Sequence, residues 1–167
     1  MVFYHTFSTE FGFSAILFGE GPLPVKRVFL PHTDKRELHR RIKSADASRP
    51  DETRPVLAMS RNIQAYFEGD LMETPWELLD LTGFTPLQCA VLRATAEIPY
   101  GEVRSYSQMA TEIKRPRACR FVGTTLARNP FPVVIPCHRI IKADGSPGQF
   151  GGGTELKKRM LSLERES

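Results

Sequence analysis

The sequence predicts an α/β protein in two parts, a small N-terminal domain over residues 1–80 and a mostly helical C-terminal domain over residues 81–167. Short apolar runs bounded by glycine and proline fill the first third, which is typical of strands. Apolar residues at helical spacing dominate the second half. The net charge is −2 over residues 1–100 and +6 over residues 101–167. This asymmetry favours a polyanionic partner for the second part, with a solvated basic face as the alternative.

Composition narrows the class of protein. With 167 residues, 41% hydrophobic and 25% charged, the chain can bury a core. No apolar run approaches the ~18 residues of a membrane helix, and residues 1–18 lack the basic start and cleavage site of a signal peptide. The three cysteines, Cys89, Cys119 and Cys137, are too few and too far apart for a disulfide framework. We therefore expect no membrane association and a reducing, cytoplasmic location, or the nucleus in a eukaryote.

The N-terminal part is predicted to be a hairpin followed by helices. The apolar runs at 14–18 and 25–30 flank a Gly-Pro turn and are expected to be antiparallel strands. A short helix is predicted over 34–43, because its first residues have the spacing of a capping box.

Three further segments complete this part. Residues 44–55 are polar and predicted to be an exposed loop. Val56, Met59, Ile63 and Tyr66 recur at helical spacing and predict a helix that ends near Gly69. Residues 71–83 are expected to be an irregular connection.

The second part is predicted to be helical. Capping pairs at Thr85 and Ser105 open helices that run to about Ile98 and Ile113. A third helix is predicted over 117–128 after a short basic break. Two short helices joined by a tight basic turn are typical of a helix-turn-helix, although many helical hairpins bind nothing.

The end of the chain completes the pattern. Residues 132–135 are expected to be extended, and the glycine-rich stretch 145–153 to be a flexible loop. A last helix is predicted over 154–164. Its core-facing residues are expected to be Leu156, Met160 and Leu163.

The run Pro136-Cys137-His138-Arg139 carries the clearest chemistry. A thiol is a nucleophile only as thiolate, and a nearby base or cation raises that fraction, so His138 is a candidate base and Arg139 a candidate positive charge. Neighbours on a strand point to opposite faces. Either the chain therefore turns here or a water bridges the two side chains. An inert buried cysteine beside a surface histidine is the alternative. The acids that could orient the base are Asp144, Glu155, Glu164 and Glu166.

Several spaced motifs resemble one family. Pro136-Cys137-His138-Arg139-Ile140 resembles the active-site signature of the O6-alkylguanine-DNA alkyltransferases, also called methylated-DNA–protein-cysteine methyltransferases. The resemblance is close over about residues 84–164 and loose over 1–70. The other matching segments are Ile98-Pro99-Tyr100-Gly101-Glu102-Val103 with Tyr106, Arg120-Phe121-Val122-Gly123, Asn129-Pro130 and Phe150-Gly151-Gly152-Gly153.

The resemblance implies a reaction. The protein would flip O6-alkylguanine, and to a lesser extent O4-alkylthymine, out of duplex DNA and move the alkyl group irreversibly to Cys137, once per chain. His138 would take the thiol proton through a water, and Glu164 would orient His138. Tyr106 would donate a proton or hydrogen bond to the leaving guanine, with a purely structural tyrosine as the alternative. No cofactor is implied.

The resemblance also implies that a monomer binds double-stranded DNA in the minor groove through the helix-turn-helix. Arg120 would fill the gap left by the flipped base, and Ala118 would allow close approach to the groove. Asn129 would tie the recognition helix to the active-site segment. An arginine facing a phosphate and a simple helix stop are the respective alternatives for Arg120 and Asn129. The further expected DNA contacts are Arg117, Thr125 and Arg128. The expected pocket residues are Gly123, Leu126, Pro132, Ile140, Phe150 and Gly151.

The family's fold has a ribonuclease-H-like sheet in the N-terminal domain and a winged-helix-like C-terminal domain. Two departures from its pattern are visible. Gly151 stands where the family often has serine, which leaves the preference among alkyl groups open. Some relatives carry a structural zinc, but residues 1–88 hold no cysteine, and the histidines there have no convincing spacing, so we expect no metal. These histidines are His5, His32 and His39.

Two other functions stay open. A damage sensor would keep the fold and bind the lesion without transfer, but such relatives lack the cysteine that is present here. A helix-turn-helix regulator with a ligand-sensing first domain would explain the basic second part, but not the Pro-Cys-His-Arg run. Labelling of Cys137 by a benzylguanine separates the three functions.

Overall fold

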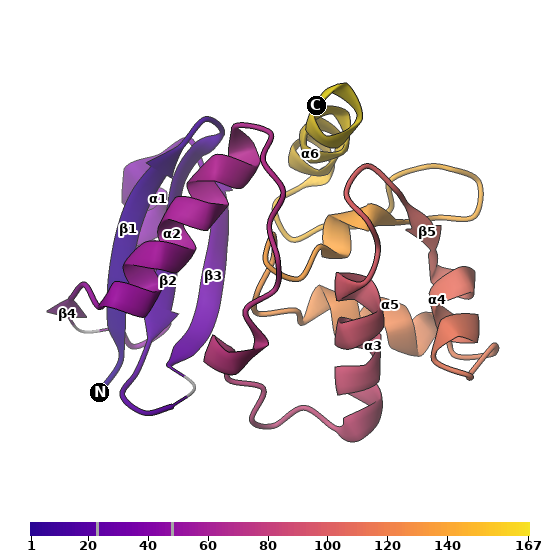
Figure 1. Cartoon of the computed structure of the whole chain (residues 1–167), viewed down its shortest axis with the longest axis horizontal. Helices are drawn as coiled ribbons and strands as arrows, with labels where there is room; N and C mark the ends of the chain where they lie inside the picture. Colours follow the sequence, from indigo (N-terminus) through magenta and orange to yellow (C-terminus); the bar gives the residue numbers. More distant parts are fainter. Residues whose placement is uncertain (23, 48) are drawn as a thin grey trace. The chain divides into compact units, whose positions relative to one another are not determined.

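The structure is a computed structural model that describes residues 1–22, 24–47 and 49–167 (Figure 1). The chain divides into two compact units, Met1–Leu81 and Thr82–Ser167. The predicted α/β class is confirmed, because the first unit holds a mainly antiparallel sheet with helices and the second is mostly helical with a helix-turn-helix. In the described part of the chain, no helix combines the length and the apolar character needed to cross a membrane.

The first unit is built on a sheet with the strand order β3-β2-β1-β4. The first three strands are antiparallel neighbours, whereas the short fourth strand runs parallel to β1. The strands are β1 (Phe3–Thr9), β2 (Gly12–Phe18), β3 (Val25–His32) and β4 (Arg49–Pro50).

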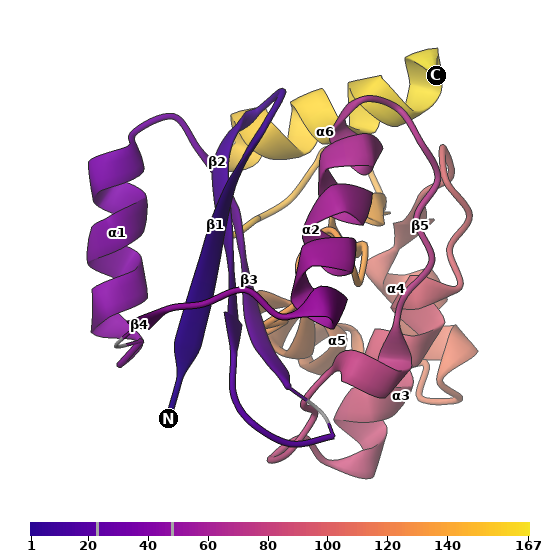
Figure 2. The ribbon, with the colours of Figure 1, turned by 60° about the vertical axis from the view of Figure 1, so that its left-hand side comes forward.

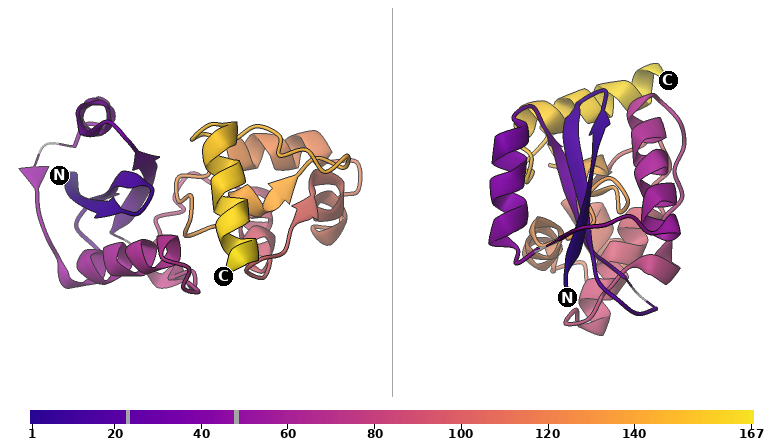
Figure 3. Two further views of the ribbon diagram at one scale, coloured as in Figure 1. Left: turned by 90° about the horizontal axis from the view of Figure 1, so that it is seen from above. Right: turned by 90° about the vertical axis from the view of Figure 1, so that its left-hand side faces the viewer.

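Helices cover both faces of this sheet. The helices α1 (Lys35–Ser44) and α2 (Arg54–Phe67) lie on opposite sides of the strands (Figures 2 and 3). Leu38 and Ile42 of α1 pack in one cluster with Leu17 of β2. The central strand β2 is therefore buried on both faces, and a continuous apolar run is the sequence pattern of such a strand.

Some predictions for the first unit were wrong at the level of single elements. Strand β1 was not predicted, because its sequence mixes polar and aromatic residues and its side chains are mostly only half-buried. The predicted loop over 44–55 contains β4 and the first two residues of α2, of which Pro55 occupies a position that proline tolerates. The predicted capping box of α1 does not form, since Asp34 accepts a hydrogen bond from the Arg36 amide. The connection over 71–83 includes one 3-10 turn, η1 (Trp76–Leu78).

The second unit forms its core from helices. Both predicted capping boxes, at Thr85 and Ser105, are present. The buried residues Val91, Met109 and Val122 come from three different helices and pack in one cluster. The elements are α3 (Pro86–Ala96), β5 (Arg104–Ser105), α4 (Tyr106–Glu112), α5 (Cys119–Ala127), η2 (Cys137–Arg139), β6 (Ile140–Ile141) and α6 (Thr154–Glu166).

The turn between α4 and α5 has a defined geometry. Lys114 adopts a left-handed conformation with φ 58°. The Arg115 amide donates to the Ala110 carbonyl at 2.8 Å, and the Lys114 amide donates to the Thr111 carbonyl at 2.9 Å. This pair of bonds is a Schellman motif, which ends α4 and reverses the chain. The helix α5 begins two residues later than predicted, with Ala118 as its N-cap.

The segment before Cys137 does not have the predicted extended conformation. Residues 132–135 form a turn, closed by a 2.7 Å hydrogen bond from the Ile135 amide to the Phe131 carbonyl. Val133 is buried and has φ 74°, a conformation that β-branched residues rarely adopt. The chain therefore turns before and through Cys137, which was one of the two alternatives for this segment.

The buried face of α6 also differs from the prediction. It consists of Lys157, Met160 and Glu164, whereas Leu156 and Leu163 are only partly buried. Two charged residues therefore point into the unit from its last helix.

Candidate active site

Cys137 is the first residue of η2 and is partly buried. Asn129, just after α5, holds the turn that leads to it. The Asn129 Nδ2 atom donates to the Ile135 carbonyl at 3.0 Å, and Oδ1 accepts from the Phe131 amide at 2.9 Å. One side chain thus connects the end of α5 to the segment before the thiol.

We expect Asn129→Ala to lower the free energy of unfolding by about 1–3 kcal/mol, because it leaves the buried Phe131 amide and Ile135 carbonyl without these partners. Urea unfolding measures this change. The matched control is Asn62→Ala on the exposed surface of α2, where alanine favours the helix and stability should not fall. Equal stability of wild type and Asn129→Ala would contradict this role of Asn129.

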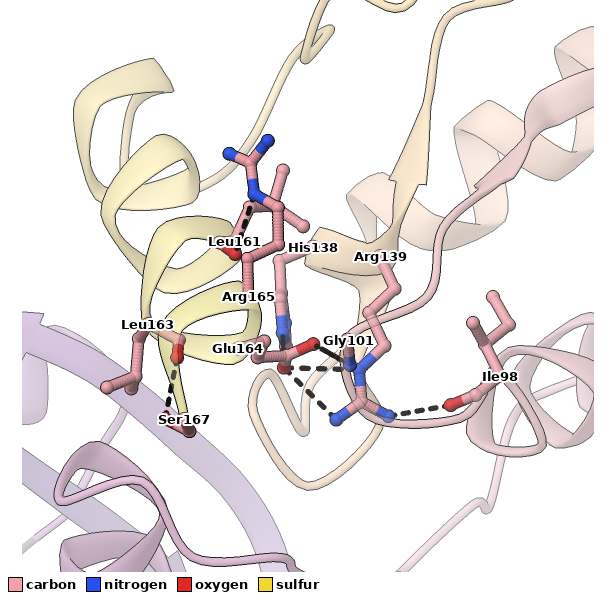
Figure 4. A network of polar contacts seen from close by, with 9 residues as sticks. All are labelled: Ile98, Gly101, His138, Arg139, Leu161, Leu163, Glu164, Arg165 and Ser167. Atoms are coloured by element: carbon pink, nitrogen blue, oxygen red, sulfur yellow. Dashed lines mark hydrogen bonds and ion pairs between the residues drawn. The ribbon is translucent and has the colours of Figure 1, made fainter.

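Glu164 is the centre of a buried polar network (Figure 4). His138 Nε2 donates to Glu164 Oε1 at 2.6 Å. Arg139 Nε donates to both carboxylate oxygens at 3.1 and 3.0 Å, and the Gly101 amide donates to Oε2 at 3.1 Å. One carboxylate therefore fixes the residue after Cys137 and compensates a buried arginine.

Arg139 serves this network rather than the thiol. Its Nη1 donates to the Ile98 carbonyl at 2.7 Å, and its guanidinium lies 5.6 Å from the centre of the Tyr100 ring. The interpretation of Arg139 as the charge that activates Cys137 is therefore not supported by its contacts. Its partners make it a part of the scaffold that holds Glu164.

The environment of His138 suits a proton acceptor. Burial lowers the pKa of His138, although the hydrogen bond and charge of Glu164 act in the opposite direction. The imidazole is thus neutral near pH 7. Because Nε2 donates to Glu164, the proton of the neutral ring is assigned to Nε2, and Nδ1 is the ring nitrogen that can accept one.

Burial raises the pKa of the Cys137 thiol. The side chain of Asn129, the charge of Lys157 and nearby backbone amides act in the opposite direction and favour the thiolate. Burial and the proximity of Cys137 also raise the pKa of Tyr106, so its hydroxyl keeps its proton. The Tyr106 ring lies against Gly123, and its hydroxyl lies against Gly148.

Lys157 is a functional candidate that sequence reasoning missed. Its side chain is 1% exposed, and its Nζ donates to the Ile140 carbonyl at 2.5 Å. Burial lowers the pKa of Lys157 from 10.5 to about 8, although the charge of Cys137 raises it. One feature of the sequence could have indicated Lys157. It stands seven residues before Glu164, and this spacing places both side chains on the same face of the last helix.

We expect Lys157→Met to slow alkylation of Cys137 by a neutral reagent such as iodoacetamide. Removing the cation raises the Cys137 pKa further, so less thiolate is present at pH 7. Lys157 loses its own charge as the pH rises through about 8. The ratio of wild-type to variant rate should therefore be largest below pH 8 and shrink above it. The control Lys158→Met removes an exposed charge from the same helix and should leave the rate unchanged.

The structure places the other predicted residues as follows. Arg117, Arg120 and Arg128 are exposed on or beside α5, as a nucleic-acid contact requires. Thr125 is 1% exposed, so its position does not fit the predicted DNA contact, because it lies on the inner face of α5. The predicted pocket residues differ in burial. Leu126, Pro132 and Ile140 are buried, Gly123 and Phe150 are half-buried, and Gly151 is exposed.

The described residues hold no group of three or more side chains placed to bind a metal ion. His5 lies beside Glu52, with 3.5 Å between its Nδ1 atom and a carboxylate oxygen of Glu52, and burial lowers its pKa.

Fold and site together define a class of protein in which a helix-turn-helix unit carries a partly buried cysteine followed by a buried His-Glu pair. Residues 86–166 match the family model for the DNA-binding domain of 6-O-methylguanine DNA methyltransferase. A methylated-DNA–protein-cysteine methyltransferase of Mycolicibacterium paratuberculosis is 47% identical over 103 residues, which are 62% of this chain and 61% of the relative. The chain thus aligns with about three fifths of that relative's length.

Solved structures extend the match to nearly the whole chain. The O6-methylguanine methyltransferase of Mycobacterium tuberculosis is 34% identical, with a TM-score of 0.77 over 99% of this chain and 94% of that one. The M. tuberculosis OGT in complex with DNA is 31% identical, with a TM-score of 0.76 over 98% of this chain and 93% of that one. The chain belongs to the methylated-DNA–protein-cysteine methyltransferase family.

Proposed function

We propose that this protein repairs alkylated DNA by moving the alkyl group of O6-alkylguanine onto Cys137, once per chain. The observation that carries this proposal is the buried hydrogen bond between His138 and Glu164. His138 directly follows Cys137, which is partly buried and packs against the same apolar cluster as Tyr106. The chain's similarity to methylated-DNA–protein-cysteine methyltransferases supports the same chemistry. An acceptor thiol must also stay reduced, which suits a reducing compartment such as the cytoplasm.

The proposed reaction uses each residue once. The Cys137 thiol passes its proton through a water to His138, whose orientation Glu164 fixes. The thiolate sulfur attacks the alkyl carbon, the bond from that carbon to guanine O6 breaks, and its electron pair passes to the guanine. Tyr106 donates a proton or hydrogen bond to the leaving base. The products are an S-alkylcysteine and an unmodified guanine.

Transfer is irreversible in this scheme. A thioether does not exchange as a disulfide does, and no reductant or cofactor enters the reaction. Crowding of the new group into the packed site should also destabilise the alkylated chain.

The proposed partner is duplex DNA bound in the minor groove by the helix-turn-helix of a monomer. A stacked base hides its O6 atom, so the lesion must leave the stack to reach Cys137. Arg120 is exposed on α5 and is the residue proposed to replace the extruded base. Minor-groove readout is nearly degenerate, so the lesion is selected by its ease of extrusion rather than by sequence. O4-alkylthymine is the proposed weaker substrate.

A titration tests this function. A fixed amount of protein is mixed with increasing duplex that carries one O6-methylguanine per molecule, and repaired guanine is counted after digestion. The proposal predicts a plateau at one repaired base for each active chain. Lesion binding without repaired guanine would indicate a damage sensor, and binding without lesion preference would indicate a regulator. Repair that continues past the plateau would contradict the single-turnover scheme.

A further inference from the structure

The helix α1 concentrates positive charge on an otherwise acidic unit. Its ten residues hold five Lys or Arg and one Glu, a net charge of +4. The remaining residues of Met1–Leu81 hold five Lys or Arg and eleven Asp or Glu, a net charge of −6. The basic charge of this unit is therefore local, and it does not arise from the composition of the unit as a whole.

Four of the five Lys and Arg side chains of α1 share one face with His39, whereas Arg41 lies on another part of the helix and pairs with Glu37. Leu38 and Ile42 lie outside this face and are buried in a cluster with Leu17 of β2 and Phe29 of β3. Five residues at positions i, i+1, i+4, i+5 and i+8 line a surface groove of about 520 Å³. We call these residues the α1 basic face. They are Lys35, Arg36, His39, Arg40 and Lys43.

Little of this charge is compensated within the unit. Glu37 is the one acid of the helix, and it already pairs with Arg40 at 2.7 Å and Arg41 at 3.2 Å. Among the described residues, Arg36 and Lys43 form no ion pair. Like charges one helical turn apart destabilise a helix by about 0.2–0.5 kcal/mol per pair. The arrangement therefore costs stability in the free protein and favours a polyanionic ligand.

The spacing of the face suits a phosphate backbone. Lys35 and Lys43 are eight residues apart, which is about 12 Å along a helix. Successive phosphates of one DNA strand rise by about 3.4 Å along the duplex axis, so the face spans about three or four of them. An anionic membrane fits less well, because the apolar face of α1 is already buried against the sheet and has no side chains left to enter lipid.

We propose that the α1 basic face binds the phosphate backbone of duplex DNA, as a contact surface separate from the helix-turn-helix. The choice of DNA as the polyanion rests on the proposed function. The contact is independent of sequence and of the lesion, since it involves point charges and no base edges. It adds affinity and salt dependence to DNA binding but takes no part in alkyl transfer.

The test compares two variants of the full chain that remove equal charge. Arg36→Gln/Lys43→Gln changes the α1 basic face, whereas Arg54→Gln/Arg61→Gln changes exposed arginines of α2 on the other side of the sheet. Binding to a long undamaged duplex is measured by fluorescence anisotropy at several salt concentrations. The first variant should lose about tenfold in affinity at low salt, and the slope of log K against log salt should fall by about two. The second should behave as wild type.

Three controls test whether a loss of DNA affinity comes from the lost charge of the α1 basic face. Arg36→Lys/Lys43→Arg keeps both charges and should bind DNA as wild type does, and thermal unfolding checks that every variant folds. Equal affinity losses in the α1 and α2 variants, or no loss in either, would overturn the proposal. Labelling of Cys137 by free O6-benzylguanine is followed in parallel. If wild type neither labels nor repairs O6-methylguanine in duplex DNA, but the α1 variant still loses DNA affinity, the proposed transfer fails and the DNA contact stands.

Discussion

Glu164→Gln is expected to destabilise the protein and to slow alkyl transfer together. The carboxylate is 4% exposed and accepts hydrogen bonds from His138, Arg139 and the Gly101 amide. Removing one partner of a buried ion pair leaves an uncompensated charge and costs about 3–5 kcal/mol. Loss of the group that orients the base should slow transfer by about 100-fold or more. Urea unfolding and the rate of labelling by O6-benzylguanine measure the two effects.

Two further variants separate these effects. Glu166→Gln neutralises an exposed acid on the same helix and should change neither stability nor rate. His138→Gln keeps the contact of Glu164 with Arg139, so it should lose rate with a smaller loss of stability. A folded Glu164→Gln protein that labels at the wild-type rate would contradict the Cys137–His138–Glu164 relay.

Arg120→Ala is expected to slow repair of methylated duplex by about 100-fold. Extruding a base costs a few kcal/mol of unstacking energy, and without Arg120 no side chain fills the gap that the base leaves. Labelling by free O6-benzylguanine should stay within about twofold of wild type, since the free base needs no extrusion. Parallel single-turnover assays with the two substrates measure this difference. Because Arg120 is exposed, its replacement should leave the free energy of unfolding nearly unchanged.

Arg128→Ala supplies the contrast. Arg128 is also exposed, at the end of α5. As a phosphate contact it should weaken binding to damaged and undamaged duplex equally and lower the salt slope by about one. An Arg120→Ala protein that slows on both substrates, or on neither, would show that Arg120 does not act in extrusion.

The fold was predictable where one local signal dominated. The double-sided burial of β2 produces a continuous apolar run, and the capping boxes at Thr85 and Ser105 mark helix starts. Strand β1 carries no such signal, because its half-buried residues mix polar and aromatic types. The turn with Val133 at φ 74° opposes the local preference of valine and is imposed by the packing and hydrogen bonds around it.

The sequence predicted those residues of the candidate site that belong to motifs of the family it resembles. The contact of Glu164 with His138 joins residues 26 positions apart, and the resemblance named both of them. Lys157 and the true partners of Arg139 were missed, because a buried charge is exceptional and its partners depend on tertiary packing. Thr125 shows the opposite error. A small polar residue on a recognition helix was expected at the surface, but it lies on the inner face.

The most direct test of the central claim is the mass of the intact protein after incubation with duplex DNA that carries O6-methylguanine. Transfer predicts a gain of one methyl group, about 14 Da, mapped to the peptide that contains Cys137. Cys89 and Cys119 are free and similarly half-buried, so they serve as internal controls and should stay unmodified. Cys137→Ala should gain nothing. An unchanged mass despite binding to the lesion, or a methyl group on Cys89 or Cys119, would contradict the assignment of Cys137 as the acceptor.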